Sequence, residues 1–116
     1  MKRNRRLITG ALVTAPFAGL VMKAGYVQAQ GKKYRFGFSQ VTTLEPWRVQ
    51  FNKDMKAEAA KHPNVELVIA DANDRTDKQN ADMENFIAQK MDVIFISPKE
   101  SAGLTGVVEK AYKAGI

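Results

Sequence analysis

The hydrophobic positions of the chain fall into short continuous runs that alternate with apolar residues spaced three or four apart. The runs span Tyr34–Gln40 (YRFGFSQ), Val65–Ala72 (VELVIADA) and Asp92–Ser97 (DVIFIS). Apolar runs of this length, bounded by turn residues, are typical of β-strands. The second run is apolar on both faces, as expected of a strand in a sheet that is covered on both sides.

The segment EPWRVQFNKDMKAEAAKH, residues 45–62, predicts an amphipathic helix. Pro46 suits the first helical position, because that residue needs no backbone donor. Pro63 then ends the helix. One face is expected to carry four apolar residues spaced by four: Trp47, Phe51, Met55 and Ala59.

Two more helices are expected, over residues 78–90 and 104–114. Thr76 or Asp77 can cap the first of them, and Gly115 suits the end of the second. The residues expected to face inward, at helical spacing, are Met83, Phe86 and Ile87 in the first helix and Leu104, Val107, Val108, Ala111 and Tyr112 in the second.

The predicted order is therefore β-α-β-α-β-α, which indicates a three-layer α/β fold: a parallel sheet with helices on both faces. Such sheets bind ligands at the carboxyl ends of their strands, near a switch in strand order. Here the segments at those ends are residues 39–48, 71–75 and 97–101. Three strands leave an exposed sheet edge, so we expect the sequence to be the first part of a longer domain.

The first 29 residues have the organisation of an export signal. The cationic start MKRNRR precedes an apolar stretch of about 16 residues, and Val27 and Ala29 suit the small-residue positions before a cleavage site. The apolar stretch contains Gly10, Pro16 and Gly19 and is short for a membrane span, which needs about 20 residues. We predict a signal peptide at residues 1–29, using the general secretory rather than the twin-arginine route, and a mature chain at residues 30–116.

This leader also carries most of the net charge. The formal charge of +6 and the pI of about 9.7 suggest at first a nucleic-acid binder. Five of the 18 basic residues and none of the 12 acidic ones lie in the leader, so 13 basic residues face 12 acidic ones in the remainder. No nucleic-acid partner is therefore expected. The sequence has no cysteine, which fits a soluble periplasmic protein without disulfides or a lipid anchor.

Trp47 and Arg48 are the most distinctive residues of the first strand-to-helix turn. An indole suits the apolar C–H face of a sugar ring, and a guanidinium suits its rim of hydroxyls. Glu45 can accept hydrogen bonds from hydroxyls, and Gln40 at the strand end can donate or accept. The alternative is that Trp47 belongs to the apolar face of its helix and Arg48 points to solvent, which spacing alone slightly favours.

Other chemistries have less support. Asp71 ends the second strand, where dinucleotide-binding folds hold a ribose, but the first loop lacks the glycines that those folds require. Asp71 is instead expected to form a hydrogen bond with the neighbouring loop. The DANDRTD segment lacks the glycine and the glutamate of a calcium loop, and His62 has no catalytic partner. We therefore expect no catalytic residues, no metal site and no cofactor.

Three segments, GFSQVTTLEPWR, ADANDRTDKQNADMENFIAQKMDVIFISP and VVEKAYKAGI, resemble the periplasmic sugar-binding proteins of ABC importers, in particular galactofuranose-binding proteins of the ribose/galactose-type cluster. The resemblance implies a type I periplasmic binding protein, with two lobes that close on one sugar and residues 30–116 as the first half of the N-terminal lobe. It also implies sugar contacts by the loop after the first strand. These carry over to Leu44, Glu45, Trp47 and Arg48, and more weakly to Gln40.

The resemblance implies a non-enzymatic protein that captures a monosaccharide in the periplasm and delivers it to an ABC permease, as a monomer at full length. The TTLEP segment departs from the galactofuranose-type pattern, so the particular sugar stays open. A periplasmic sugar sensor that signals to a chemoreceptor or histidine kinase is the alternative. An α/β enzyme is a third class, which the absent catalytic constellation disfavours. Related repressors carry a DNA-binding helix-turn-helix where this chain has its leader.

We predict that the exported chain begins at Gln30. When the chain is expressed in a bacterium with a periplasm, mass spectrometry of the periplasmic fraction should find the mass of residues 30–116. The Ala29→Arg variant should stay unprocessed, because the cleavage site needs a small residue there. An uncleaved wild-type chain in the membrane fraction would contradict the prediction.

Overall fold

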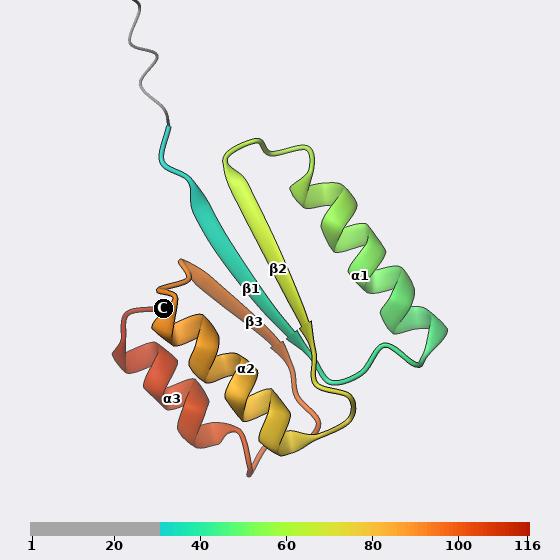
Figure 1. Cartoon of the computed structure of the whole chain (residues 1–116), viewed down its shortest axis with the longest axis vertical. Helices are drawn as coiled ribbons and strands as arrows, with labels where there is room; N and C mark the ends of the chain where they lie inside the picture. The colour runs from blue at the N-terminus through green and yellow to red at the C-terminus, as the bar shows by residue number, and fades with distance from the viewer. Residues whose placement is uncertain (1–30) are drawn as a thin grey trace, which may run out of the picture.

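The computed structural model describes residues 31–116, which form a three-stranded parallel sheet with helices on both faces (Figure 1). The predicted signal peptide lies outside the described residues. In chain order the elements are β1 (Tyr34–Gln40), α1 (Pro46–Ala59), β2 (Val65–Asp71), α2 (Thr76–Ala88), β3 (Val93–Ser97) and α3 (Thr105–Lys113). The predicted β-α-β-α-β-α order is confirmed, and the predicted bounds differ by three residues at most. Within residues 31–116, no helix combines the length and the apolar character that crossing a membrane requires.

The strand order is β2-β1-β3, so β1 lies in the centre. It pairs with β2 from Tyr34↔Val65 to Gln40↔Asp71, and with β3 up to Gln40↔Ser97. The chain moves outward from β1 to β2 and then crosses β1 to reach β3. The direction of winding therefore reverses between β1 and β3, and the ends of these two strands meet at the switch in strand order.

The two faces of the sheet are covered by different helices. On one face, the Phe38 ring lies 5.6 Å from the Phe51 ring of α1, measured between centroids. On the other face, Gly37 lies so close to α2 that a Cβ atom there would be 2.8 Å from the Phe86 ring. The core on this second face joins α2, α3 and β3 through Met83, Leu104 and Val107, with Ile87, Ile94 and Ile96 packed against them. Figure 1 accordingly shows α1 apart from the α2–α3 pair.

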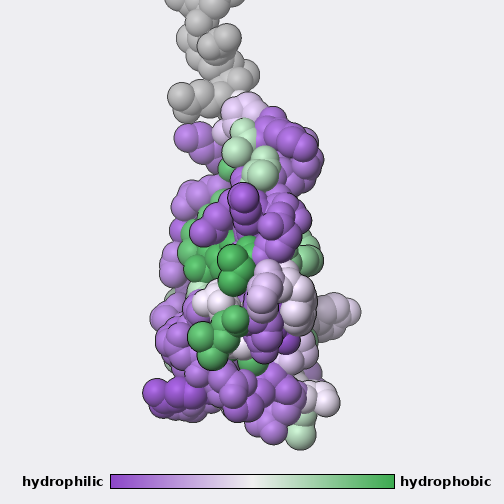
Figure 2. Space-filling view, turned by 90° about the vertical axis from the view of Figure 1, so that its right-hand side faces the viewer, coloured by the Kyte–Doolittle hydropathy of each residue, from purple (hydrophilic) through white to green (hydrophobic). Residues whose placement is uncertain are grey.

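The predicted inward face of α1 is wrong at Trp47, which is exposed. Phe51 contacts buried Phe38 but remains 46% exposed, whereas Asn52 is buried and Arg48 is partly buried. The spacing of apolar residues could not reveal this, because the helix turns polar residues inward to meet polar groups at the strand ends. Figure 2, which views the molecule from the side of α1, shows apolar patches on a largely hydrophilic surface.

Two smaller predictions about the other helices are also wrong. Neither Thr76 nor Asp77 caps α2: the residue before that helix is Arg75, and no side chain caps it. In α3, the predicted inward residues Leu104, Val107 and Ala111 are buried, but Val108 and Tyr112 are exposed. The buried face of α3 therefore includes fewer residues than its apolar spacing predicts.

Helices α2 and α3 end in the same way but with different residues. After α3, Gly115 has a φ of +82°, and the Ile116 N–H donates to the Ala111 carbonyl at 3.1 Å. After α2, Lys90 has a φ of +54°, and the Met91 N–H donates to the Phe86 carbonyl at 3.1 Å. Both are Schellman endings, in which glycine is the favoured residue because a Cβ atom is strained at positive φ. Gly115 thus fits its predicted place, and Lys90 occupies a position suited to glycine.

We predict that Lys90→Gly stabilises the chain by up to about 1 kcal/mol, because it removes the strain of a side chain at positive φ. Urea denaturation of the full chain, followed by circular dichroism, measures the change. Lys53→Gly is the matched control: Lys53 is exposed in the middle of α1, so glycine there should destabilise by about 1 kcal/mol. A loss of stability in Lys90→Gly would contradict the interpretation that Lys90 is strained at its positive φ.

Candidate functional site

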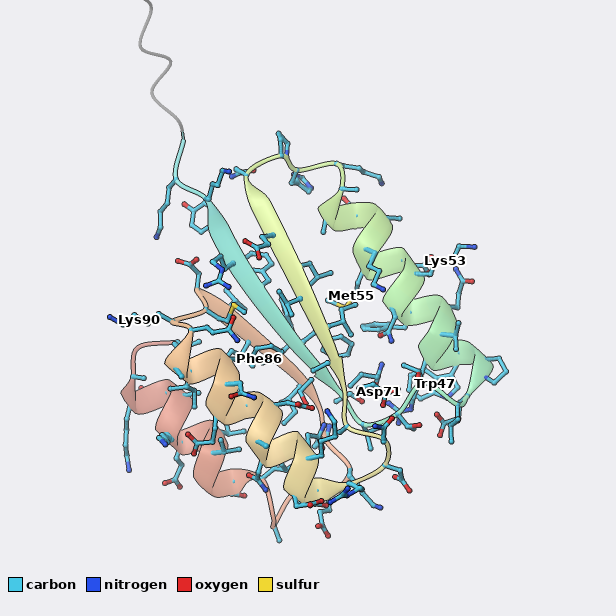
Figure 3. All side chains as sticks on the ribbon, in the orientation of Figure 1. Trp47, Lys53, Met55, Asp71, Phe86 and Lys90 are labelled. Carbon is cyan, nitrogen blue, oxygen red and sulfur yellow. The ribbon has the colours of Figure 1, made fainter. Side chains whose placement is uncertain are left out.

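The candidate site lies at the carboxyl ends of β1 and β3, where the strand order switches. The loop after β1 leads to α1 on one face of the sheet, and the loop after β3 leads to α3 on the other. In Figure 3, Trp47 and Asp71 lie at this end of the molecule, whereas Lys90 lies at the opposite end. Loops that leave in opposite directions open a crevice, which is where open parallel sheets bind ligands.

Arg48 connects the elements that meet at this crevice. Its Nη1 donates to Gln40 Oε1 at 2.6 Å and to Ser97 Oγ at 2.7 Å, and thereby joins the ends of β1 and β3. Its side chain is only 16% exposed. The alternative in which Arg48 points to solvent is therefore wrong. Its guanidinium is therefore held in one orientation by these two bonds.

Glu45 completes the surroundings of Arg48. Its Oε2 lies 3.2 Å from Arg48 Nε, yet the two buried atoms have no hydrogen-bond partner among residues 31–116. The two side chains thus form an ion pair at short distance, but their relative orientation does not meet the geometry of a hydrogen bond. Glu45 also precedes α1, and its carbonyl accepts from the Arg48 and Val49 N–H groups at 3.0 and 3.1 Å.

Trp47 lies beside this ordered guanidinium and remains accessible. Its side chain is 59% exposed, so it is not part of a core and the packing alternative is wrong for this residue. The guanidinium carbon of Arg48 lies 4.2 Å from the centroid of the Trp47 ring, a cation–π contact. An exposed aromatic surface next to fixed donors is the combination that suits a sugar ring.

Gln40 and Leu44, the other two predicted ligand residues, differ in position. Gln40 is fully buried, and its amide is engaged on both sides: Oε1 accepts from Arg48, and Nε2 donates to Asn52 Oδ1 at 3.2 Å. This arrangement favours a supporting role for Gln40. Leu44 is 85% exposed in the loop before α1. Sugar contact by the five predicted residues stays a prediction.

Sequence reasoning did not assign Ser97 and Asn52 to the site. Ser97 was expected only as the end of the third strand, and its hydroxyl accepts from Arg48 across the switch in strand order. Asn52 lies one turn after Arg48 on the inward face of α1 and holds the Gln40 amide. The four-residue spacing of Arg48 and Asn52 was the available signal, because residues at i and i+4 share a helix face.

The loop after β2 is fastened to the loop after β1. Asp71 accepts hydrogen bonds from the Thr43 hydroxyl and, at 2.8 Å, from the Asn73 N–H. The Asp74 N–H donates to the Val41 carbonyl at 2.7 Å. The prediction that Asp71 bonds to the neighbouring loop is confirmed, and the loop that carries Glu45 is held from the side of β2.

The remaining charged groups at this end of the sheet are exposed. A hydrogen bond from Arg75 lowers the pKa of the Asp77 carboxyl and raises the pKa of the Arg75 guanidinium. Within residues 31–116, no three histidine, aspartate or glutamate side chains come together as metal ligands would. The site thus consists of an aromatic face, a fixed guanidinium and a carboxylate.

These features define the class of the protein as an α/β domain with a candidate ligand site at the switch in strand order. More particularly, the chain belongs to the periplasmic binding protein domain family, whose sequence model matches residues 36–116. The family resemblance seen in the sequence is therefore confirmed.

Two curated relatives are named for sugars. The ribose import binding protein of Bacillus subtilis (strain 168) is 32% identical over 85 residues, which are 73% of this chain and 28% of that protein. The galactofuranose-binding protein of Escherichia coli (strain K12) is 30% identical over 112 residues, 97% of this chain and 32% of that protein. The chain thus spans less than a third of the length of either relative.

Solved structures agree with this family. The fructose-binding periplasmic domain of a hybrid two-component system has a TM-score of 0.68 and 34% identity, covering 72% of this chain and 27% of that one. The binding component of the arabinose ABC transporter from Shewanella sp. ANA-3, bound to arabinofuranose, has a TM-score of 0.66 and 36% identity, covering 71% and 27%. These proteins are sugar binders, and one serves a transporter while the other belongs to a signalling system.

We predict that Trp47→Ala and Arg48→Ala differ in stability. Trp47→Ala should change the free energy of unfolding by less than about 1 kcal/mol, because the side chain is exposed. Arg48→Ala should cost about 1–3 kcal/mol, because it leaves the buried Gln40 Oε1 without a donor. Urea denaturation of the full chain measures both. A loss above about 2 kcal/mol in Trp47→Ala would mean that Trp47 serves packing after all.

Proposed function

We propose that this chain belongs to the substrate-binding component of an ABC importer, which captures a monosaccharide in the periplasm and delivers it to a membrane permease without catalysis. The observation that carries the proposal is the exposed Trp47 indole beside an Arg48 guanidinium held between the ends of β1 and β3. The sugar-binding relatives and the import role in one of their names support it.

Each part of the site has a task in this proposal. The Trp47 ring covers the C–H face of the sugar, where contact is favourable because both surfaces are apolar. Arg48 donates to ring or rim oxygens through Nη2, which has no hydrogen bond within residues 31–116, while Nη1 keeps its bonds to Gln40 and Ser97. Glu45 accepts from a hydroxyl through its second carboxylate oxygen, and Leu44 borders the ligand. Gln40 supports Arg48 from beneath.

We further propose that these residues form one wall of the site. The matched relatives are about three times as long as this chain, and binding sites for small ligands usually enclose most of the ligand surface. A single wall with one aromatic face and one guanidinium should therefore bind a sugar weakly. In a full-length protein, a second lobe would close over the sugar, and the closed form would engage the permease as a monomer.

A periplasmic sensor is the second candidate function. The fructose-binding domain of a hybrid two-component system matches this chain as well as the transporter component does. The same wall would serve either role, because sensing and transport both begin with capture of the sugar. The partner decides between them: co-purification with a permease supports transport, and co-purification with a histidine kinase or chemoreceptor supports sensing.

Titration of the full chain with sugars tests the proposed site. Trp47 is the sole tryptophan of the chain, so its fluorescence reports on this position alone. D-ribose, D-fructose, L-arabinose and D-galactose should be screened, and at least one should give a saturable change with a millimolar dissociation constant. A micromolar or smaller dissociation constant, which means a binding free energy more negative than about −8 kcal/mol, would contradict the proposal that these residues form only one wall of the site.

Two controls sharpen this titration. Arg48→Ala keeps the fluorescent residue but should abolish the saturable change. Arg35→Ala removes an arginine at the opposite end of β1, where it bonds to Gln89, and should leave binding unchanged. Sorbitol, an open-chain polyol without a ring face, should give no saturable response. Equal responses from Arg48→Ala and the wild-type chain would refute sugar contact by Arg48.

A further inference from the structure

Gln79 of α2 is fully buried beneath the ends of β1 and β3. Its Nε2 donates to the Ser97 carbonyl at 2.8 Å and to the Ser39 carbonyl at 3.4 Å, and its Oε1 accepts from the Lys99 N–H at 3.1 Å. One side-chain amide thus binds Ser39 next to the end of β1, Ser97 at the end of β3, and the start of the loop after β3. Because all these partners are backbone groups, Gln79 holds the two strands and the loop in place relative to one another.

The same two strand ends are held from the opposite face of the sheet by Arg48. Arg48 bonds to the side chains of Gln40 and Ser97, whereas Gln79 bonds to the carbonyls of Ser39 and Ser97. Ser97 is common to both sets, and Ser39 and Gln40 are consecutive. The two anchors of Arg48 are thus held by the pairing of β1 with β3 and, from the other face, by the bonds of Gln79.

Gln79 also orders the loop that borders the crevice on the side of β3. Its bond to the Lys99 N–H fixes the backbone immediately after the strand. The Lys99 side chain then extends to the loop after β2, where Nζ donates to the Asp74 carbonyl at 2.6 Å. Through Lys99, the loops after β2 and β3 are joined at the same end of the sheet.

We propose that Gln79 is a positioning residue for Arg48 in sugar binding, a role that rests on the function proposed above. It acts through the strand ends and does not touch the ligand. The role requires an amide, because two carbonyls need a donor while the Lys99 N–H needs an acceptor. A carboxylate of the same shape would offer no donor to the carbonyls, and an apolar side chain would offer neither group.

The test compares Gln79→Met with Met83→Ala in the full chain. Methionine has nearly the volume of glutamine and no polar groups, so the fold should tolerate it. Met83 lies one turn further along α2 in the core with Leu104 and Val107, so its truncation destabilises the chain away from the strand ends. Gln79→Glu is a second variant, which keeps the shape and, when ionised, replaces the donor by a second acceptor and adds a negative charge.

The first readout needs no sugar: the side-chain Nε–H resonance of Arg48 in nitrogen-15 NMR spectra. In Gln79→Met and Gln79→Glu, this resonance should move toward the position of a free arginine and exchange faster with water. In Met83→Ala it should stay in place. The second readout is the Trp47 fluorescence titration with L-arabinose and D-galactose, where the Gln79 variants should bind about five- to tenfold more weakly, the effect of a lost hydrogen bond.

The outcomes separate this proposal from the proposed function. An unchanged Arg48 resonance in Gln79→Met, or an equal change in Met83→Ala, would overturn the positioning role whether or not a sugar binds. Unfolding of Gln79→Met while Met83→Ala stays folded would also overturn it, since Gln79 would then serve stability alone. If the resonance depends on Gln79 but no sugar binds the wild-type chain, the positioning of Arg48 stands and the proposed function fails.

Discussion

The guanidinium of Arg48 between the ends of β1 and β3 sets the requirements that its surroundings meet. A charge with so little exposure is costly unless it is paired and hydrogen-bonded. Glu45 supplies the opposite charge, and Gln40 and Ser97 supply acceptors. The Gln40 amide then needs an acceptor of its own, which Asn52 provides from α1. One buried charge thus explains why polar residues occupy positions where a sheet covered on both faces would otherwise be apolar.

The periodicity of the sequence was sufficient to predict the fold. Continuous apolar runs and helical spacing predicted six elements in the right order, and the alternation predicted a parallel sheet. The inward face of α1 could not be predicted in the same way, because the rule that apolar residues face inward fails where a helix covers polar strand ends. Trp47 was placed inward by that rule and is exposed, whereas Arg48 and Asn52 point inward.

The residues that meet at the site are determined by the order of the strands in the sheet. The spacing of apolar residues along the sequence carries no information about that order. Ser97 and Gln40 are far apart in sequence, and they become partners of one guanidinium only because β3 pairs directly with β1. Gln79 had no sequence signal for the same reason, since its partners are carbonyls of two different strands. By contrast, Trp47 and Arg48 were found from their chemistry and from their place after the first strand, which needs only local information.

The exposure of Leu44 has a consequence for how this kind of site can diverge. Its neighbours in the loop have structural duties: Thr43 bonds to Asp71, and Glu45 pairs with Arg48. The Leu44 side chain is almost entirely in water, and exposed positions accept substitution with little effect on stability. In the proposed function Leu44 borders the ligand, so mutations at this position would alter the surroundings of the ligand while the fold stays intact. Ligand preference could then change over evolution without loss of stability.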